Sequence, residues 1–481
     1  MRSDKGLLEQ ATRVANIILG GTGVVCLLVL FYFLYHYSLT GKRQFTSSVG
    51  MIVYYIFPAF LAGLLLVSLR LSPSHKMNLS LFVASSVVSI YALELLLSPS
   101  DIIDEHARKS QELAKQFGRT FDTRTRLEVV NDLRKKGLDA YPMITPVTLL
   151  KEGTDGRTKS AIAIDNTEVL PLAGISSKVT VLCNENGDYT IYEADEKGFH
   201  NPRGIWSNGN IVIAAVGNSF THGWCVPSDK NFVALIRKRY PATLNLGMGG
   251  NGPLLVLATI MEYAKLGKPK IVLWCHTETD LEELTRETRS PLLMRYMEQK
   301  FNQGLFSRQA AIDLALATHV EAEVRKVERP SKKSMVSKLN ATMKLNDLRQ
   351  RLGLIYGKEI AKREDPSSNA GPDMNLLREV LLQAKKNVSD WAGRLYFVYL
   401  PTRQLYANPE VANPQRDRVL LLARAIDLPI IDVHHAFQVH SDPLALFPFR
   451  HFPHYNEEGY RIVAKELFRL VSHGERSRLS N

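Results

Sequence analysis

The stretch IVIAAVGNSFTHG, residues 211–223, places a serine just after a run of apolar residues. Small and β-branched apolar side chains in a continuous run are typical of a buried strand. Gly217 allows a sharp turn after this run, and Ser219 follows two residues later. Ser219 is therefore either a nucleophile at the end of a strand or a turn residue. To act as a nucleophile it needs a general base and donors for an oxyanion.

Two later segments offer these groups. NLGMGGNGP, residues 245–253, is a glycine-rich turn whose backbone can approach a ligand closely. HFPHYNEEGY, residues 451–460, contains His454 just before an amphipathic pattern that predicts the closing helix. Taken singly, Ser219 is a turn residue and His454 is a residue at the start of a helix. Taken together in this order, they favour a nucleophile, a base and a backbone oxyanion site.

The elements that must position these residues alternate between strand and helix patterns. This alternation predicts an α/β domain with a mainly parallel sheet and helices on both faces. Sites in such sheets form beyond the carboxyl ends of the strands, where Ser219 would lie. The predicted core strands lie within residues 210–216, 242–247, 268–276, 393–401 and 428–433.

The order of these motifs resembles the SGNH (GDSL-type) superfamily of esterases and acyltransferases. AVGNSFTHG resembles its first block, NLGMGGNG the second, VLWCHTETDL (272–281) the third and HYNEEGY (454–460) the fifth. The resemblance covers roughly residues 205–285 and 393–470. It implies a flavodoxin-like three-layer α/β/α fold and acyl transfer or ester hydrolysis without metal or organic cofactor. Ser219 and His454 would be catalytic, and Ser219, Gly250 and Thr279 would form the oxyanion hole.

The chain departs from the family pattern at three positions. Asn218 stands where the family has Asp, Thr279 where it has Asn, and His451 where it has the Asp three residues before the base. The missing carboxylate predicts a Ser219–His454 dyad, with Asp442 or a backbone carbonyl as the group that orients His454. Asn218, His451, Asp442 and Asn456 are accessory candidates.

Other interpretations stay open at the same residues. Thr279 and Asp280 could equally cap the following helix. His222, His276 and His451 lie in or near the motifs, but they lack the organised ligand spacing of a metal site.

Three apolar runs in the first 100 residues are long enough to cross a bilayer, which needs about 20 residues. They are residues 16–37, 50–71 and 78–97. Lys and Arg are more frequent before the first run and between the second and third, which predicts a cytoplasmic N-terminus and an external C-terminal part. In a bacterium this is an inner-membrane protein with a periplasmic domain.

The predicted organisation has three parts. Residues 1–100 form a membrane domain, 101–204 a helical linker with a small β-rich segment, and 205–475 the SGNH-like domain with a helical insertion at about 282–390. The β-rich segment includes a hairpin across the Asn-Gly-Asp turn of TVLCNENGDYTIYE. Cys183 and Cys225 lie beside turns, and an oxidising compartment predicts a disulfide between them.

Net charge and composition narrow the partners. The formal net charge is +12 and the pI about 9.3, but the basic residues are interleaved with acidic ones. No zinc-ligand cysteine spacing or RNA-binding aromatic motif occurs, so nucleic acid is not a predicted partner. The bilayer, an acylated polysaccharide or glycolipid, and a membrane acyltransferase are the candidate partners.

The function predicted from these observations is a membrane-anchored extracytoplasmic serine esterase or O-acyltransferase. By analogy with the family, its substrate is a cell-surface polysaccharide or glycolipid. Two alternatives remain. One is a catalytically degenerate SGNH-fold module that binds glycan or supports envelope assembly. The other is a membrane-anchored lipid esterase.

Overall fold

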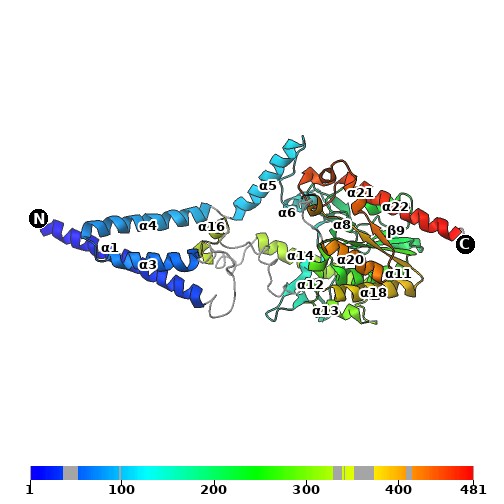
Figure 1. Cartoon of the computed structure of the whole chain (residues 1–481), viewed down its shortest axis with the longest axis horizontal. Helices are drawn as coiled ribbons and strands as arrows, with labels where there is room; N and C mark the ends of the chain where they lie inside the picture. Colours follow the sequence, from blue (N-terminus) through cyan, green and yellow to red (C-terminus); the bar gives the residue numbers. More distant parts are fainter. Residues whose placement is uncertain are drawn as a thin grey trace. The chain divides into compact units, whose positions relative to one another are not determined.

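The structure is a computed structural model, and contacts divide the chain into two compact units (Figure 1). One unit comprises residues 1–106 and 330–366, and the other comprises 107–329 and 367–481. The chain therefore passes from one unit to the other at 106/107, 329/330 and 366/367. The residues described are 2–35, 52–96, 99–298, 300–328, 339–340, 342–351, 373–407 and 414–479.

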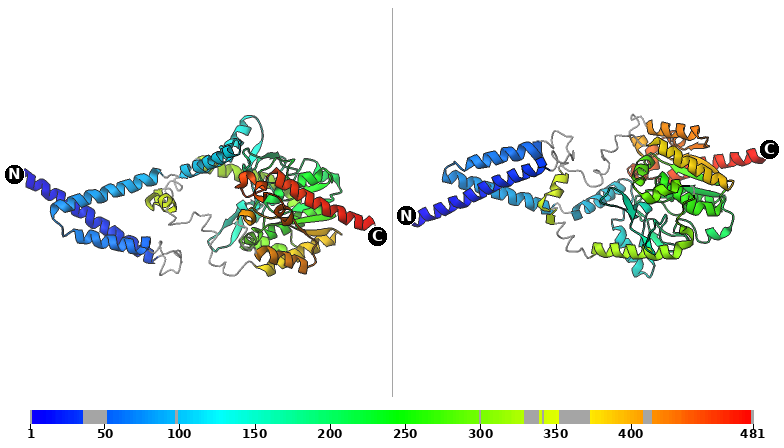
Figure 2. Two further views of the ribbon diagram at one scale, coloured as in Figure 1. Left: turned by 45° about the horizontal axis from the view of Figure 1, so that its top comes forward. Right: turned by 90° about the horizontal axis from the view of Figure 1, so that it is seen from below.

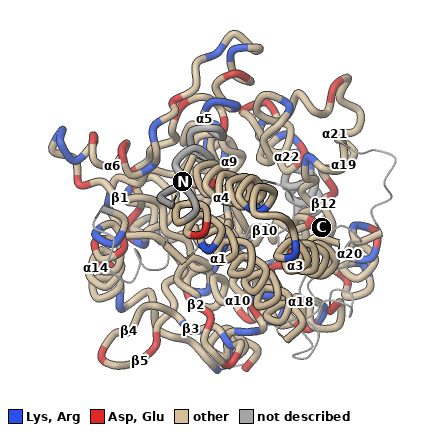
Figure 3. The backbone as a smooth tube through the Cα atoms, turned by 90° about the vertical axis from the view of Figure 1, so that its left-hand side faces the viewer, with Lys and Arg blue, Asp and Glu red and all other residues tan. Residues whose placement is uncertain are grey.

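The first unit is built from apolar helices. α1 (Arg2–Phe33) packs against α3 (Phe57–Ser68) and α4 (Pro73–Leu96), and a π-helix (Ile52–Ile56) leads into α3. Charged residues are sparse along α3, α4 and the part of α1 that follows Arg13 (Figure 3). Many of their large apolar side chains are exposed, which is unlike the core helix of a soluble protein.

Two of these helical segments are long and apolar enough to cross a membrane, Gly6–Phe33 and Pro73–Leu96. The apolar helix Ile52–Ser68 is shorter, and residues 36–51 lie outside the described ranges. Two of the three predicted spans therefore have the required length in the described part of the chain.

Part of the predicted helical insertion belongs to the first unit. α16 (Asn346–Arg351) contacts α4. The Leu348 N–H donates to the Glu94 carboxylate at 2.8 Å, and the Arg349 guanidinium donates to the Tyr54 hydroxyl at 3.0 Å. A polar side chain on an apolar helix is stabilised by such a partner. Glu94 therefore has a partner within the protein.

The second unit is centred on a parallel sheet of five strands. β8 (Ile213–Val216), β9 (Thr243–Asn245), β10 (Ile271–His276), β11 (Arg394–Tyr399) and β12 (Ile430–Asp432) lie in the order β12-β11-β10-β8-β9, and every pair is parallel. In chain order this is 5-4-3-1-2, the flavodoxin-like doubly wound arrangement. The sequence prediction of a parallel α/β sheet is confirmed, and its five strands fall in the expected segments.

Alternate strand residues point to two separate cores. Ile213, Ala215 and Leu273 pack in one core with α9 (Phe232–Arg237), α21 (His434–Gln438) and α22 (Glu457–Leu479). Ala214 and Trp274 pack in the other. This second core includes α10 (Pro253–Thr259), α18 (Met374–Asp390) and α20 (Pro414–Ala425). Helices therefore cover both faces of the sheet (Figure 2).

The predicted insertion, at about 282–390, includes α18 at its carboxyl end. Leu377, Leu381 and Ala384 of this helix are fully buried in the core. Because its apolar residues pack in this core, α18 is one of the helices that cover the parallel sheet. The other helices of this region are α12 (Asp280–Glu287), α13 (Pro291–Met294) and α14 (Gln309–Glu328).

The β-rich segment belongs to the second unit and contains the predicted hairpin. β6 (Val179–Val181) pairs antiparallel with β7 (Ile191–Glu193) and parallel with β1 (Ala140–Pro142). The hairpin's loop, residues 182–190, contains Cys183, which forms a disulfide with Cys225 at a Cα–Cα distance of 5.2 Å. This bond ties the β-rich segment to the turn that follows Ser219.

The remaining α-helices and strands of the described residues complete the two units. They are α5 (Pro99–Gln116), α6 (Arg126–Lys135), α7 (Pro146–Leu149), β2 (Leu150–Glu152), β3 (Thr158–Ser160), β4 (Ala163–Ile164), β5 (Thr167–Glu168), α8 (Ser219–His222), α11 (Lys265–Gly267) and α19 (Gln404–Ala407).

Candidate active site

Ser219 is the first residue of α8, directly beyond the carboxyl end of β8. Gly217 is required before it, because a Cβ there would lie 2.4 Å from Thr221 Oγ1 and 2.8 Å from the Cys275 carbonyl oxygen. Asn218 caps the helix by accepting from the Phe220 N–H. The sharp turn brings the Ser219 hydroxyl to the sheet edge, where sites form in this fold.

The Asn218 side chain also fixes this turn to the end of β10. Its Nδ2 donates to Thr277 Oγ1 and to Asp280 Oδ1, both at 2.8 Å. Asn218 is buried, so these bonds satisfy an amide that would otherwise be costly to bury. Asn218 therefore ties the nucleophile's turn to the residues that follow β10.

His454 reaches Ser219 from the loop before α22. Its Nε2 lies 2.8 Å from Ser219 Oγ, within the range of a hydrogen bond that can transfer a proton. The imidazole is flanked by the rings of Phe220 and Trp224, whose centroids lie 5.0 and 5.6 Å from its own. These rings restrict the orientation of the base and shield it from water.

Glu185, in the hairpin loop of the β-rich segment, contacts the other side of the imidazole. Glu185 Oε1 lies 2.8 Å from His454 Nδ1, and the second carboxylate oxygen is 3.4 Å from the His454 backbone nitrogen. A carboxylate only accepts, so Nδ1 carries the proton and Nε2 is free to accept the Ser219 proton. Both side chains are mostly buried, at 11% exposure for Glu185 and 14% for His454.

The three residues thus have the geometry of a nucleophile, a base and a carboxylate that orients the base. Glu185 was not predicted as a site residue, because it precedes His454 by 269 residues and lies outside the resembling segments. The predicted Cys183–Cys225 disulfide could have indicated it, because this bond ties the loop that holds Glu185 to the turn after Ser219.

The other groups proposed to assist His454 lie elsewhere. The prediction that Asp442 orients it was wrong, because the Asp442 carboxylate instead accepts from the Arg450 guanidinium. His451 is exposed and packs edge-on against Phe452. Asn456 binds backbone groups at the start of α22 and the Ala445 carbonyl. Its contacts are those of a capping residue.

Two backbone amides are available for an oxyanion. Gly250 follows β9 and lines the same cavity as Ser219. Its φ of +78° is in the left-handed region, and a Cβ would lie 2.7 Å from Val147. Neither the Gly250 nor the Ser219 N–H has an acceptor among the described residues. Unpaired amides at a cavity wall are what an oxyanion hole requires.

Thr279 lines this cavity too, but its hydroxyl pairs with Thr277 Oγ1 at 3.0 Å. Thr277 donates its own proton to Asp280, so Thr279 is the donor in this pair. The Thr279 proton is thereby directed inward, and the backbone amides are the donors facing the cavity.

The turn that carries Gly250 is held by a buried carboxylate of α12. Glu287 accepts from the backbone N–H groups of Gly252, Leu254 and Leu255 at 2.7, 2.8 and 3.3 Å. These are the unpaired amides at the start of α10, and a negative charge there is favourable. Burial nevertheless raises the pKa of Glu287, and the backbone donors oppose that shift.

The cavity around Ser219 has a volume of about 170 Å³. It is lined by Asn218, Ser219, Phe220, Gly250, Thr279, Glu283, Thr402, Gln404, Pro453 and His454.

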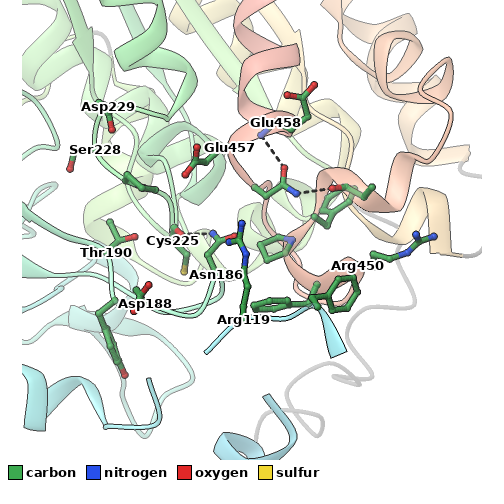
Figure 4. A pocket seen from close by; sticks show the side chains of 18 of the residues that line it. Arg119, Asn186, Asp188, Thr190, Cys225, Ser228, Asp229, Arg450, Glu457 and Glu458 are labelled. Carbon is green, nitrogen blue, oxygen red and sulfur yellow. Dashed lines mark hydrogen bonds between the residues drawn. The ribbon is translucent and has the colours of Figure 1, made fainter. Parts of the chain in front are cut away.

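A larger cavity of about 970 Å³ lies beside the disulfide (Figure 4). Neither Ser219 nor His454 lines it, although Cys225 and Asn186 do. Asn186 follows Glu185 in the hairpin loop, and its Nδ2 donates to the Cys225 carbonyl at 2.6 Å. The disulfide and this hydrogen bond together fix the loop that carries Glu185.

Within the described ranges, no group of three His, Cys, Asp or Glu side chains is arranged to hold a metal ion.

Comparisons with known proteins yielded no matching family model and no matching curated protein. Three solved structures are similar to part of the chain. A putative acylhydrolase from Bacteroides fragilis NCTC 9343 has 11% identity, a TM-score of 0.29, and coverage of 55% of this chain and 88% of its own.

The second is a two-domain esterase active on acetylated mannans, with 14% identity, a TM-score of 0.27, and coverage of 55% of this chain and 50% of its own. The third is an α/β hydrolase enzyme from the metagenome of Lake Arreo, Spain. It has 14% identity, a TM-score of 0.28, and coverage of 56% of this chain and 97% of its own. These TM-scores are low, so the similarities assign no function to this chain.

Proposed function

We propose that the protein is a serine esterase or O-acyltransferase that works through a Ser219–His454–Glu185 triad. The observation that carries this proposal is the continuous hydrogen-bonded chain from Ser219 Oγ through the imidazole to Glu185, with 2.8 Å at each step. His454 is separated in the sequence from Ser219 by 235 residues and from Glu185 by 269, and the three side chains meet in the order that activates a serine.

The reaction follows from these positions. Ser219 Oγ attacks an acyl carbonyl carbon while His454 Nε2 takes the hydroxyl proton. The oxyanion accepts from the Ser219 and Gly250 amides. As the intermediate collapses, the ester C–O bond breaks and His454 returns the proton to the leaving alkoxide. An acceptor hydroxyl or water then attacks the acyl carbon of the acyl-enzyme while His454 takes its proton. The bond between this carbon and Ser219 Oγ breaks, and His454 returns the proton to Ser219.

Glu185 supplies the negative charge that the sequence analysis found missing. It stabilises the imidazolium and holds the reactive tautomer. The alternative of a degenerate glycan-binding module rested on two absences, that of a carboxylate partner for the histidine and that of the Asn replaced by Thr279. Glu185 removes the first of these reasons.

We further propose that the site lies outside the cytoplasm and acts on an acylated cell-surface polysaccharide or glycolipid. The apolar helices of the first unit support a membrane anchor. The Cys183–Cys225 disulfide supports an oxidising compartment. A membrane acyltransferase that supplies the acyl group remains a candidate partner.

The test is hydrolysis of 4-nitrophenyl acetate by the full chain in detergent. Ser219→Ala should lower kcat/KM by about 10³-fold or more. Ser207→Ala, an exposed serine of the same unit, is the matched control and should match the wild type. Adding oligosaccharide acceptors and quantifying acylated glycan against free acid separates transferase from hydrolase. Equal turnover by wild type and Ser219→Ala would refute the proposal.

A further inference from the structure

Glu283 is an acidic residue in the cavity of Ser219 that the proposed reaction does not use. It lies on α12 between Asp280 and Glu287, and the three carboxylates face inward while Glu282 is exposed. Asp280 accepts from Asn218 and Thr277, and Glu287 accepts from the amides of the Gly250 turn. Glu283 has neither of these structural roles.

The contacts of Glu283 place it against the oxyanion turn. A Cβ on Gly252 would lie 2.6 Å from Glu283 Cβ, so α12 packs directly on the turn at this point. The Glu283 side chain is only 15% exposed, and among the described residues it forms an ion pair with Arg286, which is 59% exposed. Glu283 thus lines the cavity of Ser219 and His454, while the guanidinium that pairs with it is mostly in solvent.

The described residues that line the cavity include no Lys or Arg. A negatively charged acyl group bound there would meet the Glu283 carboxylate, whose partner Arg286 is mostly exposed to solvent. Like charges in a desolvated pocket disfavour binding. An uncharged acyl group meets no such penalty.

The size of the cavity limits the acyl chain. A cavity of about 150 Å³ accommodates a molecule of benzene's size. The volume here is about 170 Å³, below the range of about 300–1,000 Å³ for drug-sized ligands. It therefore suits an acyl group of about six heavy atoms or fewer.

We propose that Glu283 is a specificity-determining residue that restricts the site to short, uncharged acyl groups and excludes anionic ones. This inference rests on the proposed function, because it concerns the acyl group transferred by Ser219.

The experiment compares kcat/KM for 4-nitrophenyl acetate with kcat/KM for the 4-nitrophenyl monoester of succinic acid at pH 8. The wild type should prefer acetate, and Glu283→Gln should reduce this preference by about tenfold. Glu282→Gln removes the same charge from the exposed face of α12 and should leave the ratio unchanged. Because the ratio is taken within one variant, a partial loss of folded enzyme does not alter it.

A chain-length series of acetate, butyrate, octanoate and dodecanoate esters tests the size limit. Activity should fall sharply between butyrate and octanoate. Preference for succinate in the wild type, an unchanged ratio in Glu283→Gln, or equal activity across the series would each overturn the inference while leaving the serine esterase proposal intact. Failure of every ester and of a fluorophosphonate to react would instead reject both.

Discussion

At the scale of single residues, the proposed triad depends most on Glu185, which belongs to none of the sequence motifs. Its contact with His454 Nδ1 replaces the carboxylate that the resembling family places three residues before the histidine. The carboxylate comes from another part of the chain, but it contacts the ring nitrogen that such a residue must contact.

Glu185→Gln should therefore lower kcat by up to about 10⁴-fold, because an amide cannot stabilise the imidazolium and permits the wrong tautomer. Glu185→Asp should retain intermediate activity. Asp442→Asn is the control, since Asp442 contacts Arg450 and not the histidine. Steady-state kinetics on 4-nitrophenyl acetate measure all three. A larger loss in Asp442→Asn than in Glu185→Gln would mean that the carboxylate is misassigned.

Because Glu283 is buried, we expect the free energy of unfolding to depend on pH. Burial raises the pKa of Glu283 to about 7 from 4.5, although Arg286 opposes the shift and Asp280 and Glu282 add to it. His454 lines the same cavity, and Glu287 lies next to Glu283 against Gly252. The folded state therefore favours the neutral acid, so raising the pH from about 5 to 8 costs stability as the buried group ionises.

Glu283→Gln removes this cost. Its stability relative to wild type should rise by about 1–3 kcal/mol between pH 5 and pH 8. Denaturant unfolding of both proteins at the two pH values measures the difference, with Glu282→Gln as the control. A constant or decreasing difference would show that Glu283 is already ionised at pH 5 in the folded protein.

At the scale of elements, the hairpin loop 182–190 is the unexpected contributor to the site. The loop is fixed by the Cys183–Cys225 disulfide and by the Asn186 hydrogen bond to the Cys225 carbonyl. The disulfide closes a loop with a sequence separation of 42 residues, for which a stabilisation of about 2–4 kcal/mol is typical.

Replacing both Cys183 and Cys225 with Ser should lower this stability and also lower kcat, because Glu185 loses its fixed position. In a Glu185→Gln background the same pair of substitutions should cost little further activity, since the group they position is already absent. Kinetics of the four proteins form the test. An equal loss of kcat in both backgrounds would show that the disulfide acts on the site by another route.

The core strands could be predicted because buried parallel strands are continuous apolar runs with characteristic lengths. Ser219 and Gly250 could be predicted because each follows a core strand. His454 could be predicted because it precedes the closing helix. Glu185 was missed because its contact depends on how the β-rich segment packs on the sheet domain. The packing of α18 on the sheet could not be predicted, because strand spacing alone does not distinguish a helix that covers a sheet from one inside an insertion.

At the scale of the whole molecule, the number of spans decides which side of the membrane holds the site. With three spans and a cytoplasmic N-terminus the C-terminal part is external, whereas with only α1 and α4 crossing it is cytoplasmic. The disulfide and the Lys/Arg distribution favour the first arrangement.

Alkaline phosphatase fused after Asn481 should therefore be active, and the same reporter inserted after Ser72, between α3 and α4, should be inactive. A fluorescent protein that folds only in the cytoplasm should give the reverse pattern. Activity after Ser72 combined with inactivity after Asn481 would establish two spans and would contradict an extracytoplasmic site.

The central claim, that Glu185 and His454 activate Ser219 as a nucleophile, is tested most directly by covalent labelling with a fluorophosphonate and mass spectrometry of the labelled peptide. The account predicts one adduct, on Ser219, formed rapidly by the wild type, absent in Ser219→Ala and slowed strongly in His454→Ala and Glu185→Gln. Failure of the folded wild type to label, or an adduct on another residue that persists in Ser219→Ala, would contradict it.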